Sequence, residues 1–156
     1  MISLYQTIPF PNTPINKMKL KNMEQYKYKT PSQIASLTIH LSCEAIRWLN
    51  GTTKDNDNRI ISHHSIFFDL LSRIKTEKCT DLSFRRPQVL EPGQAQFSEF
   101  QLSKEWNMGR KKIHNLLTMM QELRLIELYN SRTASLLSFG CIRDWELADT
   151  NPAGGL

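Results

Sequence analysis

The chain has 156 residues with a net charge of +5, and 40% of them are hydrophobic, which is typical of one globular domain rather than a disordered polymer. No apolar stretch approaches the roughly 18 residues that a membrane-spanning helix needs, which excludes an integral membrane protein. The cysteines at positions 43, 79 and 141 match neither a disulfide framework nor a zinc pattern, and the first residues do not form a secretory signal. We therefore expect a cytoplasmic protein.

Both ends of the chain lack a periodic apolar face. Residues 1–30 carry five lysines and one glutamate, a net charge of +4, and they contain three prolines. They predict a mobile basic N-terminal arm, which either lies along phosphate groups or serves only as a solubilising leader. Residues 148–156, with one proline and two glycines, predict a flexible tail.

The first periodic segment predicts a long helix over residues 31–50. The sequence Thr30-Pro31-Ser32 is typical of a helix start, and Asn50-Gly51 is typical of a helix end. One face would carry the apolar side chains at spacings of three and four, namely Ile34, Leu37, Leu41, Ala45 and Trp48. This face either packs on the following helix or forms a homodimer contact. With the polar loop expected at 52–58, the helix makes up an N-terminal unit over residues 31–61.

A second helix is expected to begin at Ser62 and to end near Lys75–Lys78. The next segment holds prolines at positions 87 and 92, so it predicts at best a short edge strand followed by a turn at Glu91–Gln94. The strong amphipathic helix lies further on, at 110–124, where Ile113, Leu116, Leu117, Met120 and Leu123 share one face.

The region from 98 to 139 predicts a helix at 98–106, a turn at 107–109, the helix at 110–124, and two antiparallel strands at 125–129 and 133–139. A short helix, a tight turn and a longer helix form a helix-turn-helix, and the appended hairpin makes it winged. We therefore predict a mainly α fold with a small antiparallel β-hairpin, a winged helix-turn-helix domain over residues 62–147 with an additional N-terminal helix.

The sequence also resembles a family over residues 62–145. The residues that carry the resemblance are Gly93-Gln94, Leu102–Trp106, Gly109–Ile113 and Leu123–Ile126, preceded by Phe67–Leu71. They resemble the winged helix-turn-helix domains of bacterial and phage replication initiators (DnaD-like, replisome-organiser) and of small regulators. The chain departs from that pattern at Ser103, where alanine is usual, at Gly109, where a serine caps the helix, and at Arg124, where glycine is usual.

The predicted function is double-stranded DNA binding, as a transcription regulator or a replication-initiation accessory in a mobile-element context that the resemblance implies. A helix that buries Ile113, Leu117 and Met120 turns its other face outward, toward a DNA major groove. Arginine pairs with guanine and asparagine with adenine, whereas lysines at a helix start meet phosphates. Arg132, at the hairpin turn, is expected to enter a minor groove or meet a phosphate. The predicted DNA contacts are Arg110, Lys111, Lys112, His114, Asn115, Thr118 and Arg132.

An alternative is a protein-interaction module in which the basic helix start meets an acidic partner and no DNA is read directly. The sequence holds no glycine-rich phosphate loop, serine elbow or His-Glu-x-x-His motif, so we predict neither an enzyme nor a cofactor. His63-His64 lies at a predicted helix start without cysteine or carboxylate partners at helical spacing, so we predict no metal site.

Overall fold

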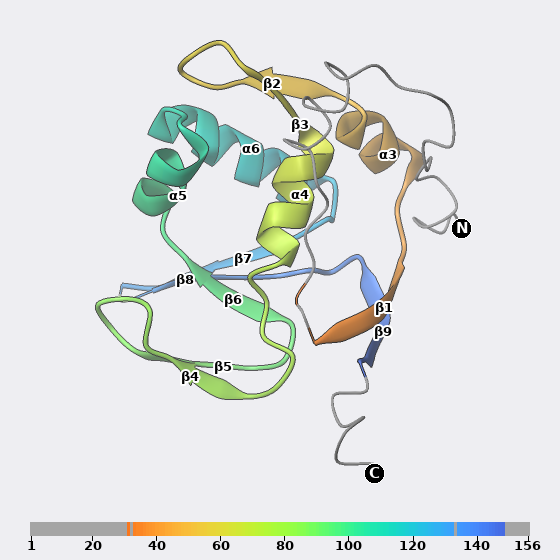
Figure 1. Cartoon of the computed structure of the whole chain (residues 1–156), viewed down its shortest axis with the longest axis vertical. Helices are drawn as coiled ribbons and strands as arrows, with labels where there is room; N and C mark the ends of the chain where they lie inside the picture. Colours follow the sequence, from red (N-terminus) through yellow and green to blue (C-terminus); the bar gives the residue numbers. More distant parts are fainter. Residues whose placement is uncertain (1–30, 32, 133, 149–156) are drawn as a thin grey trace.

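The computed structural model describes residues 31, 33–132 and 134–148 (Figure 1). This part of the chain contains four helices and nine strands, and the strands form four small antiparallel sheets. Since the strands contain nearly as many residues as the helices, the predicted mainly α fold, a winged helix-turn-helix with an additional N-terminal helix, is wrong. The expected basic arm at 1–30 and the tail after Ala148 lie outside the described residues.

The predicted helix over 31–50 is replaced by a strand and a short helix. β1 (Ile34–Ile39) runs antiparallel to β9 (Ile142–Leu147), and only then does α3 (Cys43–Leu49) begin. The true cap is Ser42, whose hydroxyl accepts a 3.0 Å hydrogen bond from the amide of Ala45. The apolar residues of 34–39 thus satisfy a helical spacing by coincidence, because the strand partner that decides the outcome lies more than 100 residues away.

The apolar side chains of this segment are used inside the chain itself. Ile34, Leu41 and Ala45 belong to the hydrophobic core, and α3 contacts α4 (His63–Leu71). A homodimer contact through a helix at 31–50 therefore loses its structural basis, because neither the helix nor a free apolar face exists there.

Residues 52–62 form a hairpin rather than the predicted polar loop. β2 (Thr52–Lys54) pairs antiparallel with β3 (Ile60–Ser62). Asp55 closes the turn: its buried carboxylate accepts hydrogen bonds from the amides of Asp57 at 2.8 Å and Arg59 at 2.9 Å. The backbone polar groups of the turn are therefore satisfied locally.

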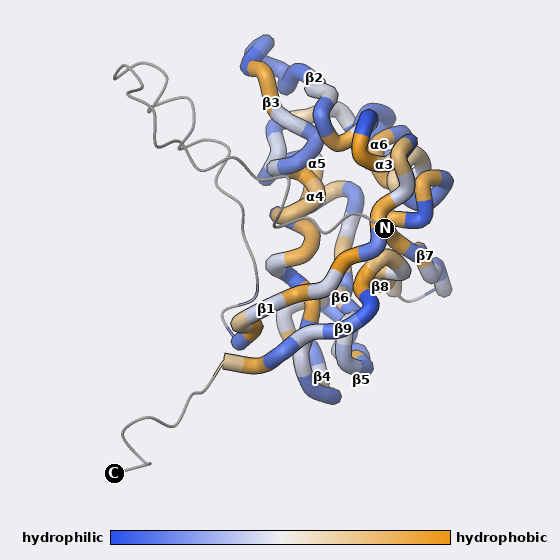
Figure 2. The backbone as a smooth tube through the Cα atoms, turned by 90° about the vertical axis from the view of Figure 1, so that its right-hand side faces the viewer, coloured by the Kyte–Doolittle hydropathy of each residue, from blue (hydrophilic) through white to orange (hydrophobic). Residues whose placement is uncertain are grey.

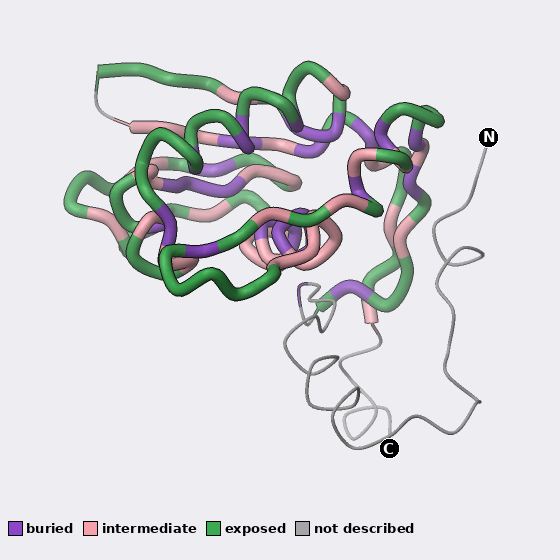
Figure 3. The backbone as a smooth tube through the Cα atoms, turned by 90° about the horizontal axis from the view of Figure 1, so that it is seen from above, coloured by how far each residue is buried: buried purple, intermediate pink, exposed green. Residues whose placement is uncertain are grey.

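Helix α4 lies at the centre of the core. It begins at the predicted place, because Ser62 accepts a hydrogen bond from the amide of Ser65, but it ends at Leu71 rather than near Lys75–Lys78. Figure 3 views this helix end-on and shows that its buried residues face the rest of the molecule. The buried set is Ile66, Phe67, Phe68, Leu70 and Leu71.

A second hairpin and a turn follow α4. β4 (Cys79–Asp81) pairs with β5 (Gln88–Leu90), leaving residues 82–87 as a connecting loop. The predicted turn at Glu91–Gln94 is confirmed: the amide of Gln94 donates to the carbonyl of Glu91 at 3.1 Å, and Gly93 adopts φ +87°. That left-handed conformation is the reason for glycine at this position.

The three-stranded sheet has the order β6-β8-β7, formed by β6 (Gln94–Phe97), β7 (Glu127–Asn130) and β8 (Ser135–Ser138). Between β6 and β7 come α5 (Glu99–Trp106) and α6 (Arg110–Glu122), close to the predicted positions. Far from α5, β1 and β9 lie side by side as a separate ribbon (Figure 2).

Helix α6 ends in a Schellman motif whose left-handed residue is Arg124. The amide of Leu125 donates to the carbonyl of Met120 and that of Arg124 to the carbonyl of Gln121, at 2.9 and 3.0 Å. Arg124 has φ +61°, a region that costs about 1 kcal/mol for a residue with a Cβ atom.

We predict that Arg124→Gly raises the free energy of unfolding by about 1 kcal/mol relative to Arg124→Ala, because both remove the side chain and only glycine removes the backbone strain. Thermal denaturation checks this as a melting temperature about 2–4 °C higher for the glycine variant. Equal melting temperatures would show that the αL conformation costs nothing here.

The histidine pair at the start of α4, His63 and His64, is expected to make the stability of the protein depend on pH. His63 stacks on Trp48 with ring centroids 4.0 Å apart, and its Nδ1 lies 2.6 Å from the carbonyl oxygen of Trp48. Burial lowers the pKa of His63 below its usual 6.5, and burial followed by the proximity of His63 lowers the pKa of His64.

In the unfolded chain, these histidines bind protons near pH 6.5, whereas in the folded chain they bind protons only at lower pH. The free energy of unfolding therefore falls as pH drops below about 6.5. One fully linked proton is worth at most about 1.4 kcal/mol per pH unit. Urea denaturation between pH 7.5 and 5.5 measures the loss, and His63→Phe, which keeps an aromatic ring on Trp48, should lose less. An identical pH dependence in this variant would contradict the assignment to His63.

Candidate nucleic-acid interface

Helix α6 turns five of the predicted contact residues to solvent. Its inward face is the predicted one, with Ile113, Leu116, Leu117 and Met120 buried in the core. On the outward face the exposed residues are Arg110, Lys111, His114, Asn115 and Thr118. Side chains at positions i, i+4 and i+8 of a helix share one face, so Arg110, His114 and Thr118 form a row along the exposed side.

Lys112 is exposed as well, but it is engaged within the protein. Its Nζ donates a 2.6 Å hydrogen bond to the carbonyl oxygen of Lys54 in β2. The contact ties the start of α6 to the β2–β3 hairpin. Lys112 is therefore better described as a residue that positions α6 than as a free phosphate contact.

His114 meets a carboxylate on the neighbouring helix. Its Nδ1 lies 3.1 Å from Oε1 of Glu99, the first residue of α5. Glu99 thus brings a negative charge to the surface that was predicted to meet DNA. This pairing was not predicted from the sequence, because the two residues lie 15 positions apart on different helices.

The strongest positive feature is a groove that brings four arginines together, which we name the arginine groove. Arg85 and Arg86 come from the β4–β5 loop, Arg110 from the start of α6, and Arg132 from the β7–β8 turn. The groove has a volume of about 450 Å³, and Glu99 is its one acidic residue within the described part of the chain. Figure 1 shows the β4–β5 loop and the β7–β8 turn on the same side of the molecule.

Two of these arginines were not predicted from the sequence. Arg85-Arg86 stands in a proline-containing segment between two three-residue strands, where no periodicity assigns a direction to the side chains. The only local signal was the pair of adjacent arginines. The β4–β5 hairpin packs against β6 of the three-stranded sheet, and this packing brings Arg85 and Arg86 next to Arg110 and Arg132.

The opposite end of α6 has a different charge. A larger hollow of about 940 Å³ is lined there by Glu44, Glu122 and Glu127 together with Arg124 and Arg143. The α6 helix therefore runs from a strongly basic end to a mixed and partly acidic end. The start of the helix is thus the end with the excess of positive charge, and the free amides and the helix dipole there also favour negative charge.

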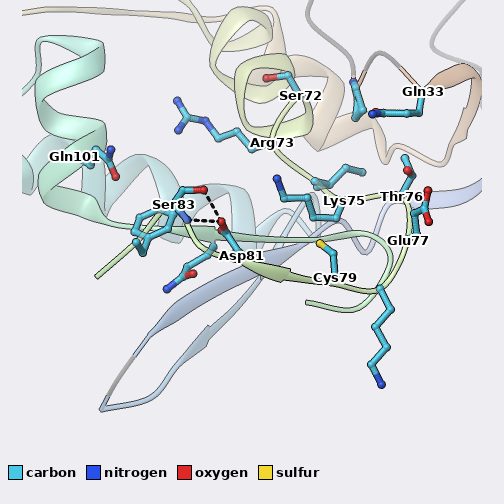
Figure 4. Close-up of a pocket in the computed structure, with 15 residues that line it drawn as sticks. Gln33, Ser72, Arg73, Lys75, Thr76, Glu77, Cys79, Asp81, Ser83 and Gln101 are labelled. Atoms are coloured by element: carbon cyan, nitrogen blue, oxygen red, sulfur yellow. Dashed lines mark hydrogen bonds between the residues drawn. The ribbon is translucent and has the colours of Figure 1, made fainter. Parts of the chain in front are cut away.

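A third hollow, of about 500 Å³, lies below α4 (Figure 4). One of its charged residues, Arg73, is paired inside the protein, with Asp69 at 2.8 Å and with Glu105 at 2.6 Å. Asp81 accepts hydrogen bonds from the amide and the hydroxyl of Ser83, as the dashed lines in Figure 4 show. The Arg73 contacts connect the end of α4 to α5, and the Asp81 contacts close the chain at the end of β4, so both have a structural role.

Neither a metal centre nor a membrane-spanning helix is present in the described residues. They contain no group of three or more histidine, cysteine, aspartate or glutamate residues arranged to hold a metal ion. Within the same residues, every helix is too short or too polar to cross a lipid bilayer.

We predict that Glu99→Gln raises the affinity for a short duplex DNA about threefold, because it removes the one carboxylate of the arginine groove while an amide keeps a hydrogen bond to His114. Fluorescence anisotropy at 50 mM salt measures the change. Glu122→Gln, at the other end of the same helix, is the matched control and should leave the affinity unaltered. Equal effects of both variants would mean that only net charge matters.

No family model matches this chain, and no curated protein or solved structure is similar to it at a significant level.

Proposed function

We propose that the protein binds double-stranded DNA, with the exposed face of α6 in the major groove and the arginine groove on the adjacent phosphate backbone. The observation that carries the proposal is the convergence of Arg85, Arg86, Arg110 and Arg132 from three separate segments beside that face. Like charges brought together repel one another, and a polyanion relieves the repulsion.

The side chains on α6 suit the edges of base pairs. A major groove about 12 Å wide admits a helix. Arg110 can donate two hydrogen bonds to guanine, and Asn115 can both donate to and accept from adenine. Thr118, further along the same face, can contact either a base or a thymine methyl group. These residues carry sequence preference, whereas Lys111 and the remaining groove arginines carry affinity.

A regulator of transcription and an accessory of replication initiation both require this contact. The proposal therefore includes both roles without depending on either one. The competing function is an interface for an acidic protein. It would use the same basic surface but would not read DNA directly.

If Lys111, Arg85, Arg86 and Arg132 each neutralise one phosphate while Arg110 meets a base, a plot of log K against log salt concentration should have a slope of about −3 to −4. Arg85→Ala combined with Arg86→Ala should reduce the magnitude of the slope by about 2 and weaken binding about tenfold at low salt. The measurement is a fluorescence titration of a labelled duplex between 50 and 200 mM salt.

The matched control removes two exposed arginines elsewhere, Arg47 on α3 and Arg143 on β9, which leaves the net charge equal to that of the double variant. Its slope should equal that of the unaltered protein. A slope near zero for the unaltered protein would overturn the proposal. Arg110→Ala with Lys111→Ala decides the competing function: unchanged duplex binding together with lost capture of an acidic protein would favour the interaction module.

A further inference from the structure

The arginine groove also contains exposed aromatic rings. The structure describes six phenylalanines, and four of them are buried, with at most 6% of their surface exposed. The other two are Phe84, which is half-buried, and Phe100, which is 54% exposed. Both line the arginine groove, from the β4–β5 loop and from the first turn of α5.

Leaving a phenylalanine in water forfeits the hydrophobic stabilisation that its burial would give. The four buried rings show that the core accommodates this side chain where it is needed. Other large apolar side chains of the described residues are at least as exposed, for example Leu82 and Val89, but Phe100 is the one that lines the arginine groove. Its place beside four guanidinium groups suggests a ligand with both negative charge and flat apolar faces.

A cation already lies on Phe100. Nζ of Lys104, one turn further along α5, is 4.3 Å from the centre of the Phe100 ring. This contact holds the ring in place at low entropic cost and adds a positive charge next to it. The aromatic side chain and its basic neighbours thus form one mixed surface along the groove.

An intact duplex offers no open base face on which such rings can stack. Its outer surface presents phosphates and sugars, and the faces of its bases are covered by stacking on one another. An unpaired strand presents phosphates and open base faces together, and proteins bind it by combining a basic groove with stacking aromatic rings. Arginine side chains also stack on bases.

Resting on the proposed function, we propose that the arginine groove binds an unpaired strand that continues from the duplex held by α6. The preferred substrate is a junction between double-stranded and single-stranded DNA. Arg110 joins the two parts of the site, because it starts the exposed face of α6 and also lines the groove. The strand leaves the duplex at Arg110 and passes between Arg132 and the Phe84–Arg86 segment.

The test compares four labelled DNAs in fluorescence anisotropy with the full chain: a blunt 20-base-pair duplex, the same duplex with a six-thymidine tail, the same duplex with a six-residue abasic tail, and the six-thymidine strand alone. The thymidine tail should raise the affinity at least about fivefold over the blunt duplex, the smallest effect of one stacked base. The abasic tail, which has the same phosphates without bases, should recover only part of that gain.

Phe100→Leu should reduce the difference in affinity between the thymidine and abasic tails at least about twofold, because Phe84 remains, and should leave the blunt-duplex affinity within about twofold. Its matched control is Tyr129→Leu, because Tyr129 is 46% exposed on β7 but lines the hollow at the other end of α6. Both substitutions are at exposed positions, so the fold is retained, and circular dichroism checks this.

Each outcome separates the two proposals. Duplex binding with equal affinity for thymidine and abasic tails overturns the junction while the duplex proposal stands. Binding of tailed DNA and of the free strand, with no binding of the blunt duplex, overturns the duplex proposal and leaves the groove as a single-strand site. Binding to none of the four DNAs overturns both.

Discussion

The candidate interface depends on the burial of one face of α6. Ile113, Leu117 and Met120 are each at most 2% exposed, and they lock the rotation of the helix about its own axis. Because rotation is fixed, the side to which Arg110 and Asn115 point is fixed as well. The hydrogen bond from Lys112 to β2 restrains the start of the helix in the same orientation. The exposed polar face of α6 is thus held in a fixed orientation because the opposite, apolar face is buried.

Local chemistry made part of this arrangement predictable. The 3.6-residue periodicity of 110–122 and the serine caps at Ser62 and Ser98 gave the correct starts of α4, α5 and α6. The turn at Gly93 was also predicted correctly, because proline followed by glycine is typical of a type II turn. Every predicted contact on α6 is exposed, because a strong amphipathic pattern determines both faces of a helix at once.

The remainder depends on contacts that no local window contains. Residues 34–39 become a strand because β9 pairs with them, and β6 pairs with β8, about 40 residues further along the chain. The arginine groove is assembled from the β4–β5 loop, α6 and the β7–β8 turn, so Arg85 and Arg86 gave no signal beyond their charge. The predicted fold class was wrong partly for the same reason, because β1–β9 and β6–β8 pair at a distance, and partly because the β2–β3 and β4–β5 hairpins are built from three-residue strands too short to show periodicity.

The β1–β9 pair has a consequence for synthesis on the ribosome. Ile34 pairs with Leu147, so the partner of β1 is translated after all the residues that line the arginine groove. Closing so long a loop costs only about 0.6 kcal/mol for each doubling of its length, and the finished protein loses little stability. The nascent chain, however, carries β1 with unpaired amides and carbonyls until β9 emerges, and an unpaired strand edge can associate with other chains.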